Sequence, residues 1–229
     1  MAIEWVGLDA DDTLWHSEDG FNDVIGAFLD VAMPYTDAGR DDVERRLLAI
    51  EHANLEVFGY GVKGFTLSMI EAAVEMSAGS IPSNELARVV DLGRELMRRP
   101  VELLDGVAEV VAELAGSHRL LLITKGDLLH QETKVIQSGL EPHFHAIEIV
   151  SEKHPEAYRR VLRRHDIAPE AFVMVGNSVK SDILPVLAIG GAAVHIPYQF
   201  LWGAEHAEHD GTVPELSSIT ALPAWLAGR

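Results

Sequence analysis

Helical periodicity dominates the N-terminal part of the chain. Apolar side chains recur there every three or four positions in four successive segments, the spacing that gathers them on one face of an amphipathic helix. Pro34 and the glycines at positions 59, 61 and 64 interrupt the pattern, and Ser83 stands where it could cap the last helix. We therefore expect an all-α insertion that follows a short apolar strand. The expected helices cover about residues 21–32, 41–58, 65–76 and 85–97.

From Pro100 onward, short apolar runs alternate with helical segments. Alternation at this spacing is typical of a parallel sheet with helices on both faces. We predict an α/β fold with a Rossmann-like core in residues 1–14 and 100–229 and an all-α subdomain in residues 15–99. The expected strands cover about residues 3–8, 120–123, 146–150, 172–175 and 193–196, and the expected helices cover 107–114, capped by Asp105, 128–137 and 156–165.

Composition narrows the classes of partner and compartment. The chain has 229 residues, 36 Asp and Glu against 18 Lys and Arg, and a formal net charge of −18, which argues against nucleic acid or an anionic membrane as partner. No cysteine is present, so disulfides and thiolate metal sites are excluded. Residues 1–8 do not resemble a signal peptide, and no apolar run approaches the ~20 residues that cross a bilayer. We expect a cytoplasmic protein.

Polar side chains follow four of the predicted strands directly. The carboxyl ends of parallel strands meet at one edge of the sheet, where open α/β folds bind their ligands, so these side chains are expected to share one site. The residues concerned are Asp9 and Asp11 after the first strand, Thr124, Lys125 and Gly126 after the second, Lys153 after the third, and Asn177 and Asp182 after the fourth.

The two N-terminal aspartates suggest covalent catalysis with a metal ion. Carboxylates this close repel each other unless a cation or a shared proton intervenes. Asp9 is the candidate nucleophile that attacks phosphorus, and Asp11 is the candidate acid and base, a role worth ~10²–10⁴-fold in rate. Asp182, with Asp9 and the main-chain carbonyl of Asp11, is expected to hold Mg²⁺, which prefers oxygen ligands.

The other predicted site residues suit a phosphoryl group. Thr124, with the backbone amides of Lys125 and Gly126, stands before a predicted helix, where amide groups bind phosphate oxygens. Lys153 carries a positive charge that can neutralise both the nucleophile and the phosphoryl group. The substrate class indicated by these residues is a phosphomonoester.

Together these motifs resemble those of haloacid dehalogenase superfamily hydrolases, of the subclass whose helical cap is inserted after the first strand. The resemblance covers nearly the whole chain and rests on four motifs in the family's order. It implies a catalytic core with residues 15–99 as the cap, Mg²⁺ as cofactor, and the same roles for Asp9, Asp11, Lys153 and the metal ligand Asp182. A small phosphorylated metabolite is the implied partner of a monomer or homodimer.

One residue departs from the family pattern. Many relatives carry Gly-Asp where this chain has Gly176 and Asn177, so three carboxylates, of Asp9, Asp11 and Asp182, are expected around the metal instead of four. An amide oxygen can still accept a hydrogen bond from metal-bound water but adds no charge. We expect Mg²⁺ to bind more weakly rather than not at all.

Two other functions remain open at this point. A 2-haloacid dehalogenase attacks carbon and, in this superfamily, needs neither metal nor the second aspartate, so the presence of Asp11 favours a phosphatase. A binding or regulatory protein on a catalytically weak scaffold is suggested only by Asn177. The spacing of His143 with His145 and of His206 with His209 resembles that of metal ligands, but surface histidines in loops are the commoner reading.

Overall fold

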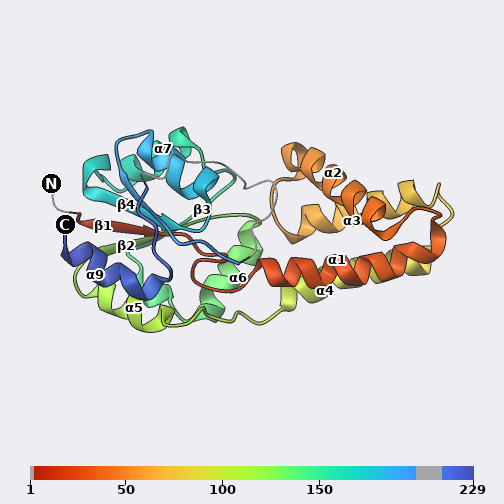
Figure 1. Cartoon of the computed structure of the whole chain (residues 1–229), viewed down its shortest axis with the longest axis horizontal. Helices are drawn as coiled ribbons and strands as arrows, with labels where there is room; N and C mark the ends of the chain where they lie inside the picture. The colour runs from red at the N-terminus through yellow and green to blue at the C-terminus, as the bar shows by residue number, and fades with distance from the viewer. Residues whose placement is uncertain (1–2, 200–212) are drawn as a thin grey trace. The chain divides into compact units, whose positions relative to one another are not determined.

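The computed structural model describes residues 3–199 and 213–229, which divide into two compact units (Figure 1). We call the first the α/β unit and the second the helical unit. The α/β unit consists of Met1–Glu18, Val101–Lys125 and Gln131–Arg229, and the helical unit of Asp19–Pro100 and Gly126–His130. The expected helical insertion is therefore present, and a short segment from the middle of the chain packs with it.

The α/β unit is built on one parallel sheet of five strands in the order β3-β2-β1-β4-β5. Side chains alternate between the two faces: Leu120 and Leu122 of β2 enter one hydrophobic cluster, whereas Leu121 and Ile123 enter another. This burial of both faces explains why the strands are continuous apolar runs. The strands are β1 (Trp5–Leu8), β2 (Arg119–Lys125), β3 (Ala146–Val150), β4 (Phe172–Gly176) and β5 (Ala192–His195).

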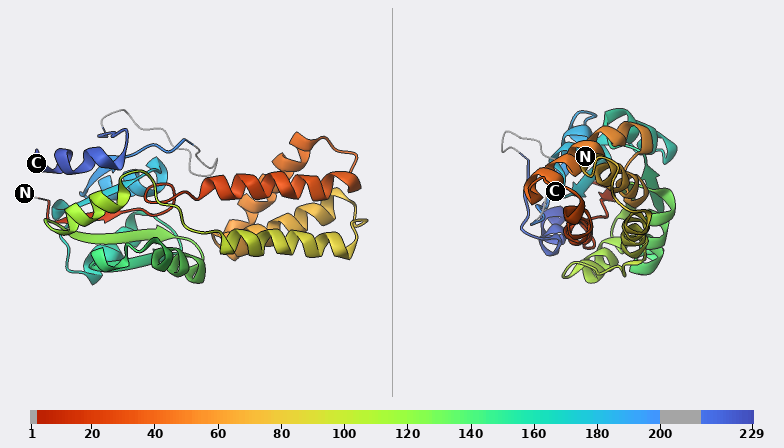
Figure 2. Two further views of the ribbon diagram at one scale, coloured as in Figure 1. Left: turned by 90° about the horizontal axis from the view of Figure 1, so that it is seen from below. Right: turned by 90° about the vertical axis from the view of Figure 1, so that its right-hand side faces the viewer.

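Helices cover both faces of this sheet, as predicted. On one face, α5 (Val107–Ala115) and α9 (Leu222–Ala227) contribute buried apolar side chains, and α7 (Pro155–Arg164) with α8 (Leu184–Leu187) does so on the other (Figures 1 and 2). The helix α6 (Leu128–Ser138) connects β2 to β3. The prediction of a Rossmann-like α/β core is confirmed.

The helical unit contains four long helices around a core of its own. That core is entirely separate in sequence from the core of the sheet, because its buried residues come from Val24 to Leu96. Near one end, a side chain added at Gly20 of the first helix would meet Leu96 of the fourth, so these two helices touch there. The helices are α1 (Glu18–Ala32), α2 (Arg40–Phe58), α3 (Val62–Met76) and α4 (Ser83–Arg98), shown in two further views in Figure 2.

Two predicted helix caps are wrong. The helix α4 begins at Ser83 itself, so Pro82 is its N-cap residue and no side chain caps it. The helix α5 is preceded by Gly106 in the left-handed conformation, with φ +74°, so Asp105 lies one residue too early to cap it. Sequence spacing identified both helices but missed the conformation of the residue that precedes each.

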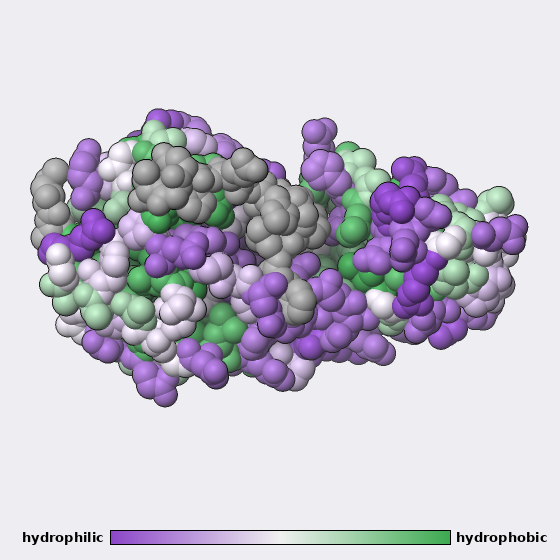
Figure 3. Space-filling view, in the orientation of Figure 1, coloured by the Kyte–Doolittle hydropathy of each residue, from purple (hydrophilic) through white to green (hydrophobic). Residues whose placement is uncertain are grey.

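Other expectations concern the surface and the loops. In the residues with described positions, no helix is both long and apolar enough to span a membrane. Hydrophilic residues are spread over much of the visible surface in Figure 3, in keeping with the high net charge. His206 and His209 lie outside the described residues, so their predicted surface location stays a prediction.

Candidate functional site

Adjacent strand ends bring Asp9 and Asp182 together. Asp9 is the first residue after β1, and its backbone amide donates to the carbonyl of Val175 in β4 at 2.9 Å. After β4 the chain forms a π-helical turn, Val179–Ile183, which carries Asp182 back over the strand end. Gly176 leaves room for this return, because a Cβ atom there would overlap the Asp182 carboxylate.

Lys153 links these two carboxylates into one buried group. Its ammonium donates to Asp9 and, at 2.7 Å, to Oδ1 of Asp182. All three residues are nearly inaccessible to solvent, with exposed fractions of 6% for Asp9, 5% for Lys153 and 1% for Asp182. Three predicted site residues from three strand ends are therefore in direct contact.

The charges in this group do not balance. Burial and the neighbouring charge of Asp182 raise the pKa of Asp9 to about 7, although the ammonium of Lys153 opposes the shift. Burial alone would lower the pKa of Lys153, but the two carboxylates outweigh it and raise that pKa. One cation thus faces two buried carboxylates, a distribution that favours a further positive charge.

Thr13 fixes the nucleophile candidate, and sequence reasoning assigned it no role. Its hydroxyl donates to Oδ2 of Asp9 at 3.0 Å and accepts from the backbone amide of Asn177 at 3.1 Å. The hydroxyl thereby joins the ends of β1 and β4. The signal was present in the sequence, because Thr13 follows Asp9 and Asp11 in the same short motif.

Asp11 lies in a different environment from Asp9. Lys134 donates to both of its carboxylate oxygens, at 2.6 and 2.7 Å, and Trp15 and Gln131 donate one hydrogen bond each, at 2.6 and 2.9 Å. Its side chain is 30% exposed. Burial raises the pKa of Asp11, but the charge and hydrogen bonds of Lys134, with those of Gln131 and Trp15, lower it overall. The carboxylate is therefore held in its ionised form.

The expectation of three carboxylates around one metal stays a prediction, and in the structure the contacts of Asp11 differ from those of Asp9 and Asp182. Within residues 3–199 and 213–229, no three side chains of His, Cys, Asp or Glu are grouped as a ready metal site. The Asp11 carboxylate is bound by Lys134 from α6, which sequence reasoning did not foresee. Asp9 and Asp182 are the two carboxylates that both contact Lys153.

The three residues of the predicted phosphate-binding segment, 124–126, lie in different surroundings. Thr124, in β2, is buried, and its Oγ1 accepts a hydrogen bond from Gln131 at 2.8 Å. The ammonium of Lys125 donates to Oγ of Ser181 at 3.1 Å, beside Asp182. Gly126 has φ +140° and belongs to the helical unit. The structure thus brings Thr124 and Asp11 together through Gln131, and Lys125 close to the turn that carries Asp182.

Three lysines near the strand ends offset part of the protein's negative charge at the site. The chain has only five lysines, and three of them, Lys125, Lys134 and Lys153, have mostly buried side chains near the strand ends. An anionic substrate would meet these three ammonium groups despite a formal net charge of −18. Sequence reasoning used Lys153 for its charge but missed Lys134.

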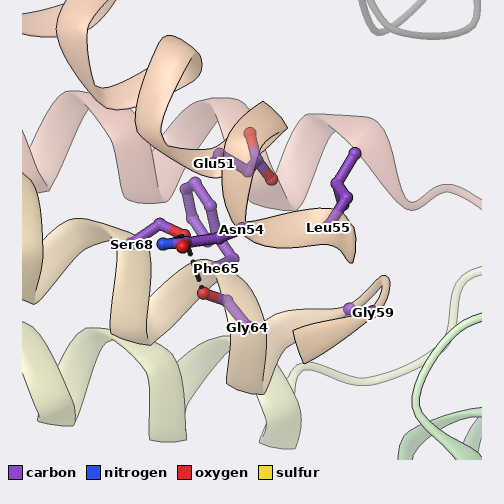
Figure 4. Close-up of a pocket in the computed structure, with 8 residues that line it drawn as sticks. Glu51, Asn54, Leu55, Gly59, Gly64, Phe65 and Ser68 are labelled. Carbon is purple, nitrogen blue, oxygen red and sulfur yellow. Dashed lines mark hydrogen bonds between the residues drawn. The ribbon is translucent and has the colours of Figure 1, made fainter. Parts of the chain in front are cut away.

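A small hollow in the helical unit lies between α2 and α3 (Figure 4). Its polar side chains bond one another: Asn54 donates to Oγ of Ser68 at 3.1 Å, and that hydroxyl donates to the carbonyl of Gly64 at 2.9 Å. The first of these bonds joins α2 to α3, and the second lies within α3. We therefore read the hollow as part of the packing of the helical unit.

Replacing Gly176 by Ala is expected to displace Asp182 and destabilise the fold. The added methyl group would overlap a carboxylate that is itself bound to Lys153, and such overpacking costs about 1–3 kcal/mol in the free energy of unfolding. Urea denaturation measures the loss. Gly26→Ala in α1 is the control, because no atom beyond the surrounding backbone of its own helix lies within 4 Å of the added Cβ. Equal stability of the Gly176→Ala variant and wild type would show that Asp182 does not need this space.

Comparison with known proteins gives a family match over most of the chain. The model of the haloacid dehalogenase-like hydrolase family matches residues 3–190. A solved haloacid dehalogenase-like family hydrolase from Xanthomonas campestris is 44% identical, with a TM-score of 0.88 over 99% of this chain and 91% of that one.

More distant matches include a curated phosphatase and a solved structure with the same fold. A glyceraldehyde 3-phosphate phosphatase from Pyrococcus furiosus is 29% identical over 112 residues, which are 46% of this chain and 45% of that protein. The match therefore spans less than half of that relative. A structure described as a predicted phosphoglycolate phosphatase from Haemophilus somnus is 17% identical, with a TM-score of 0.68 over 97% of each chain, a likeness of fold.

Proposed function

The chain belongs to the haloacid dehalogenase-like hydrolases, and from this premise we propose that it is a Mg²⁺-dependent phosphatase of small phosphomonoesters. The observation that carries the proposal is the buried group in which Lys153 contacts both Asp9 and Asp182. It provides a nucleophile with a fixed orientation beside a positive charge. The partial match to a glyceraldehyde 3-phosphate phosphatase supports phosphorus as the centre attacked.

In the first step, a carboxylate oxygen of Asp9 attacks phosphorus. A bond forms between that oxygen and phosphorus while the bond from phosphorus to the alcohol oxygen breaks, which leaves an aspartyl-phosphate. Asp11 donates a proton to the departing oxygen, so the product leaves as a neutral alcohol. Lys153 offsets the negative charge of the nucleophile and the phosphoryl group, and Thr13 holds Oδ2 of Asp9 in place.

In the second step, water hydrolyses the aspartyl-phosphate. Asp11, now ionised, accepts a proton from water as the oxygen of water attacks phosphorus, and the Asp9 carboxylate is released with inorganic phosphate. The contacts of Asp11 with Lys134 and Gln131 suit this stage, because they stabilise its ionised form. The first step needs a proton on Asp11, which these contacts do not favour.

The donor atoms of the site fit Mg²⁺. Two buried carboxylates face one ammonium, and the available donors are oxygens, the ligands that Mg²⁺ prefers. Asp9 and Asp182 would hold the ion, with the main-chain carbonyl of Asp11 and the side chain of Asn177. When bound, Mg²⁺ neutralises phosphoryl charge and orients the phosphoryl group for attack.

Asp11 also separates this proposal from a dehalogenase. Cleavage of a carbon–halogen bond needs no proton donor for the leaving group, whereas an alcohol leaving from phosphorus benefits from one. Asp11 receives hydrogen bonds from Lys134, Gln131 and Trp15. These contacts hold in place a residue that dehalogenation would not use, which favours the phosphatase.

We extend the proposal to the helical unit and the substrate. Residues 15–99 would serve as a cap that limits the substrate to a small phosphorylated metabolite, in a protein that works as a monomer or homodimer without nucleic acid or membrane. The high negative charge of the chain supports the exclusion of nucleic acid.

Metal dependence tests the proposed reaction. We expect the purified protein to release phosphate from an aryl phosphate in MgCl₂ and to lose that activity in EDTA, with recovery when excess Mg²⁺ is restored. Phosphate release by a colorimetric assay is the measurement, and halide release from a 2-haloacid is measured in parallel. Halide release in EDTA without phosphatase activity would favour the dehalogenase instead.

A further inference from the structure

The helix α6 exposes three large apolar side chains and buries two polar ones that face the site. Leu128, Leu129 and Ile136 are 58–66% exposed, whereas Gln131 and Lys134 are 2% and 8% exposed. An amphipathic helix that packs only for stability shows the opposite polarity. Gln131 and Lys134 are three residues apart, so they share one side of the helix, and both reach Asp11. The side of α6 that carries Gln131 and Lys134 is therefore buried against Asp11.

Gln131 contacts more of the site than Lys134 does. Its Nε2 lies 2.9 Å from Oδ2 of Asp11, 2.8 Å from Oγ1 of Thr124 and 2.7 Å from the carbonyl oxygen of Lys125. The Asp11 carboxylate and the Lys125 carbonyl can only accept, so the amide orientation is fixed, since a reversed amide would place its oxygen against them. The two amide hydrogens are shared among the three oxygens. Its Oε1 is buried and has no hydrogen-bond partner among the described residues.

The bond to Thr124 sets the direction of the Thr124 hydroxyl. A hydroxyl has one hydrogen to donate, and here its oxygen accepts from Gln131. In the part of the chain that the structure describes, no acceptor for that hydrogen is found. The hydrogen remains available for a phosphoryl oxygen.

We infer that Gln131 is a positioning residue that sets the phosphate contact, Thr124, and the acid/base, Asp11, relative to each other through one amide group. This inference rests on the proposed phosphatase function. It assigns a role to a residue outside the motifs that identified the site. Two separable effects follow, one on phosphate binding through Thr124 and one on leaving-group protonation through Asp11.

The test replaces Gln131 by Met, which keeps the length and adds no charge. For phosphate binding, calorimetry with inorganic phosphate and Mg²⁺ is expected to give weaker binding in Gln131→Met than in wild type. For proton transfer, kcat/KM is expected to fall about 10-fold more on an alkyl phosphate than on an aryl phosphate, since only the alkyl leaving group depends strongly on an acid. Gln137→Met, at an exposed position of the same helix, is the control and should change neither quantity.

A double-mutant cycle separates positioning from general disruption. If Gln131 acts through Thr124, the Gln131→Met change should weaken phosphate binding much less in a Thr124→Val background than in wild type. Independent effects in the cycle, with equal losses on alkyl and aryl substrates, would overturn the inference. Should Gln131→Met fail to fold, Gln131→Asn, which keeps the amide but shortens its reach, is measured in the same cycle.

The two readouts distinguish failure of the inference from failure of the proposed function. Phosphate binding is measured without turnover. Wild-type protein that binds phosphate but hydrolyses no ester would overturn the function, and the binding cycle would still decide whether Gln131 positions Thr124. Wild-type protein that hydrolyses esters, with an unchanged Gln131→Met variant, would overturn the inference alone.

Discussion

Replacing Asp9 by Asn is expected to lower phosphatase activity by about 10³-fold or more, because an amide oxygen cannot form the aspartyl-phosphate. Brief reaction with an isotopically labelled ester, followed by acid quenching, should leave covalent label on the wild-type protein and none on the Asp9→Asn variant. Both measurements use MgCl₂ in excess. A variant that retained wild-type turnover would exclude Asp9 as the nucleophile.

The same variant is expected to remain folded. The pKa of Asp9 is raised from 3.8 to about 7 by burial and by Asp182. When the pKa of a carboxyl is higher in the folded protein than in the unfolded chain, the protein loses stability as the pH rises from the unfolded pKa through the folded one. Asn removes that pH-dependent loss, so in EDTA above pH ~7 the variant should be at least as stable as wild type. Asp30→Asn, at an exposed ion pair with Arg40, controls for the chemical change.

Replacing Lys153 by Met is expected to cost about 3–5 kcal/mol in the free energy of unfolding and to remove activity. Lys153 is the ammonium between Asp9 and Asp182, and its loss leaves two buried carboxylates facing each other. Without it, burial and the repulsion of Asp182 should raise the pKa of Asp9 further, because the ammonium of Lys153 is what opposes that shift. The destabilisation should therefore be larger at about pH 8 than at about pH 5, where protonation relieves it.

Urea denaturation of the Lys153→Met variant in EDTA measures this effect at the two pH values. Lys63→Met is the matched control, because Lys63 forms an ion pair with Asp127 in which its own side chain is 55% exposed. Such a surface pair contributes about 0–1 kcal/mol, so little change is expected there. Similar losses in the two variants, or a loss at Lys153 independent of pH, would contradict the account of the buried group.

Local sequence pattern predicted most of the secondary structure and the principal site motifs. The strand at 146–150 and the limits of α2 follow from apolar spacing and from the glycines that end the periodicity. Asp9, Lys153 and Asp182 could be grouped in advance because each follows a strand of a parallel sheet. Their catalytic roles remain predictions, as does the role of residues 15–99 as a cap.

The helix α6 shows where pattern reasoning fails. The sequence predicted a helix at 128–137, but not that Leu128 and Ile136 would be exposed and Lys134 buried. Periodicity reports which residues share a side of a helix but not which side faces the sheet. That choice here depends on Asp11, more than a hundred residues earlier in the chain, whose carboxylate binds Lys134.

The sequence by itself determined the alternation of strands and helices, the helical insertion, and the positions of chemically capable side chains at strand ends, because these depend on local spacing. Only the tertiary structure decided how those side chains pair. It placed Lys153 between Asp9 and Asp182, paired Asp11 with Lys134, and connected Asp11 to Thr124 through hydrogen bonds of Gln131. Pairing of buried charges depends on the distances between distant segments, which exist only once the sheet has formed.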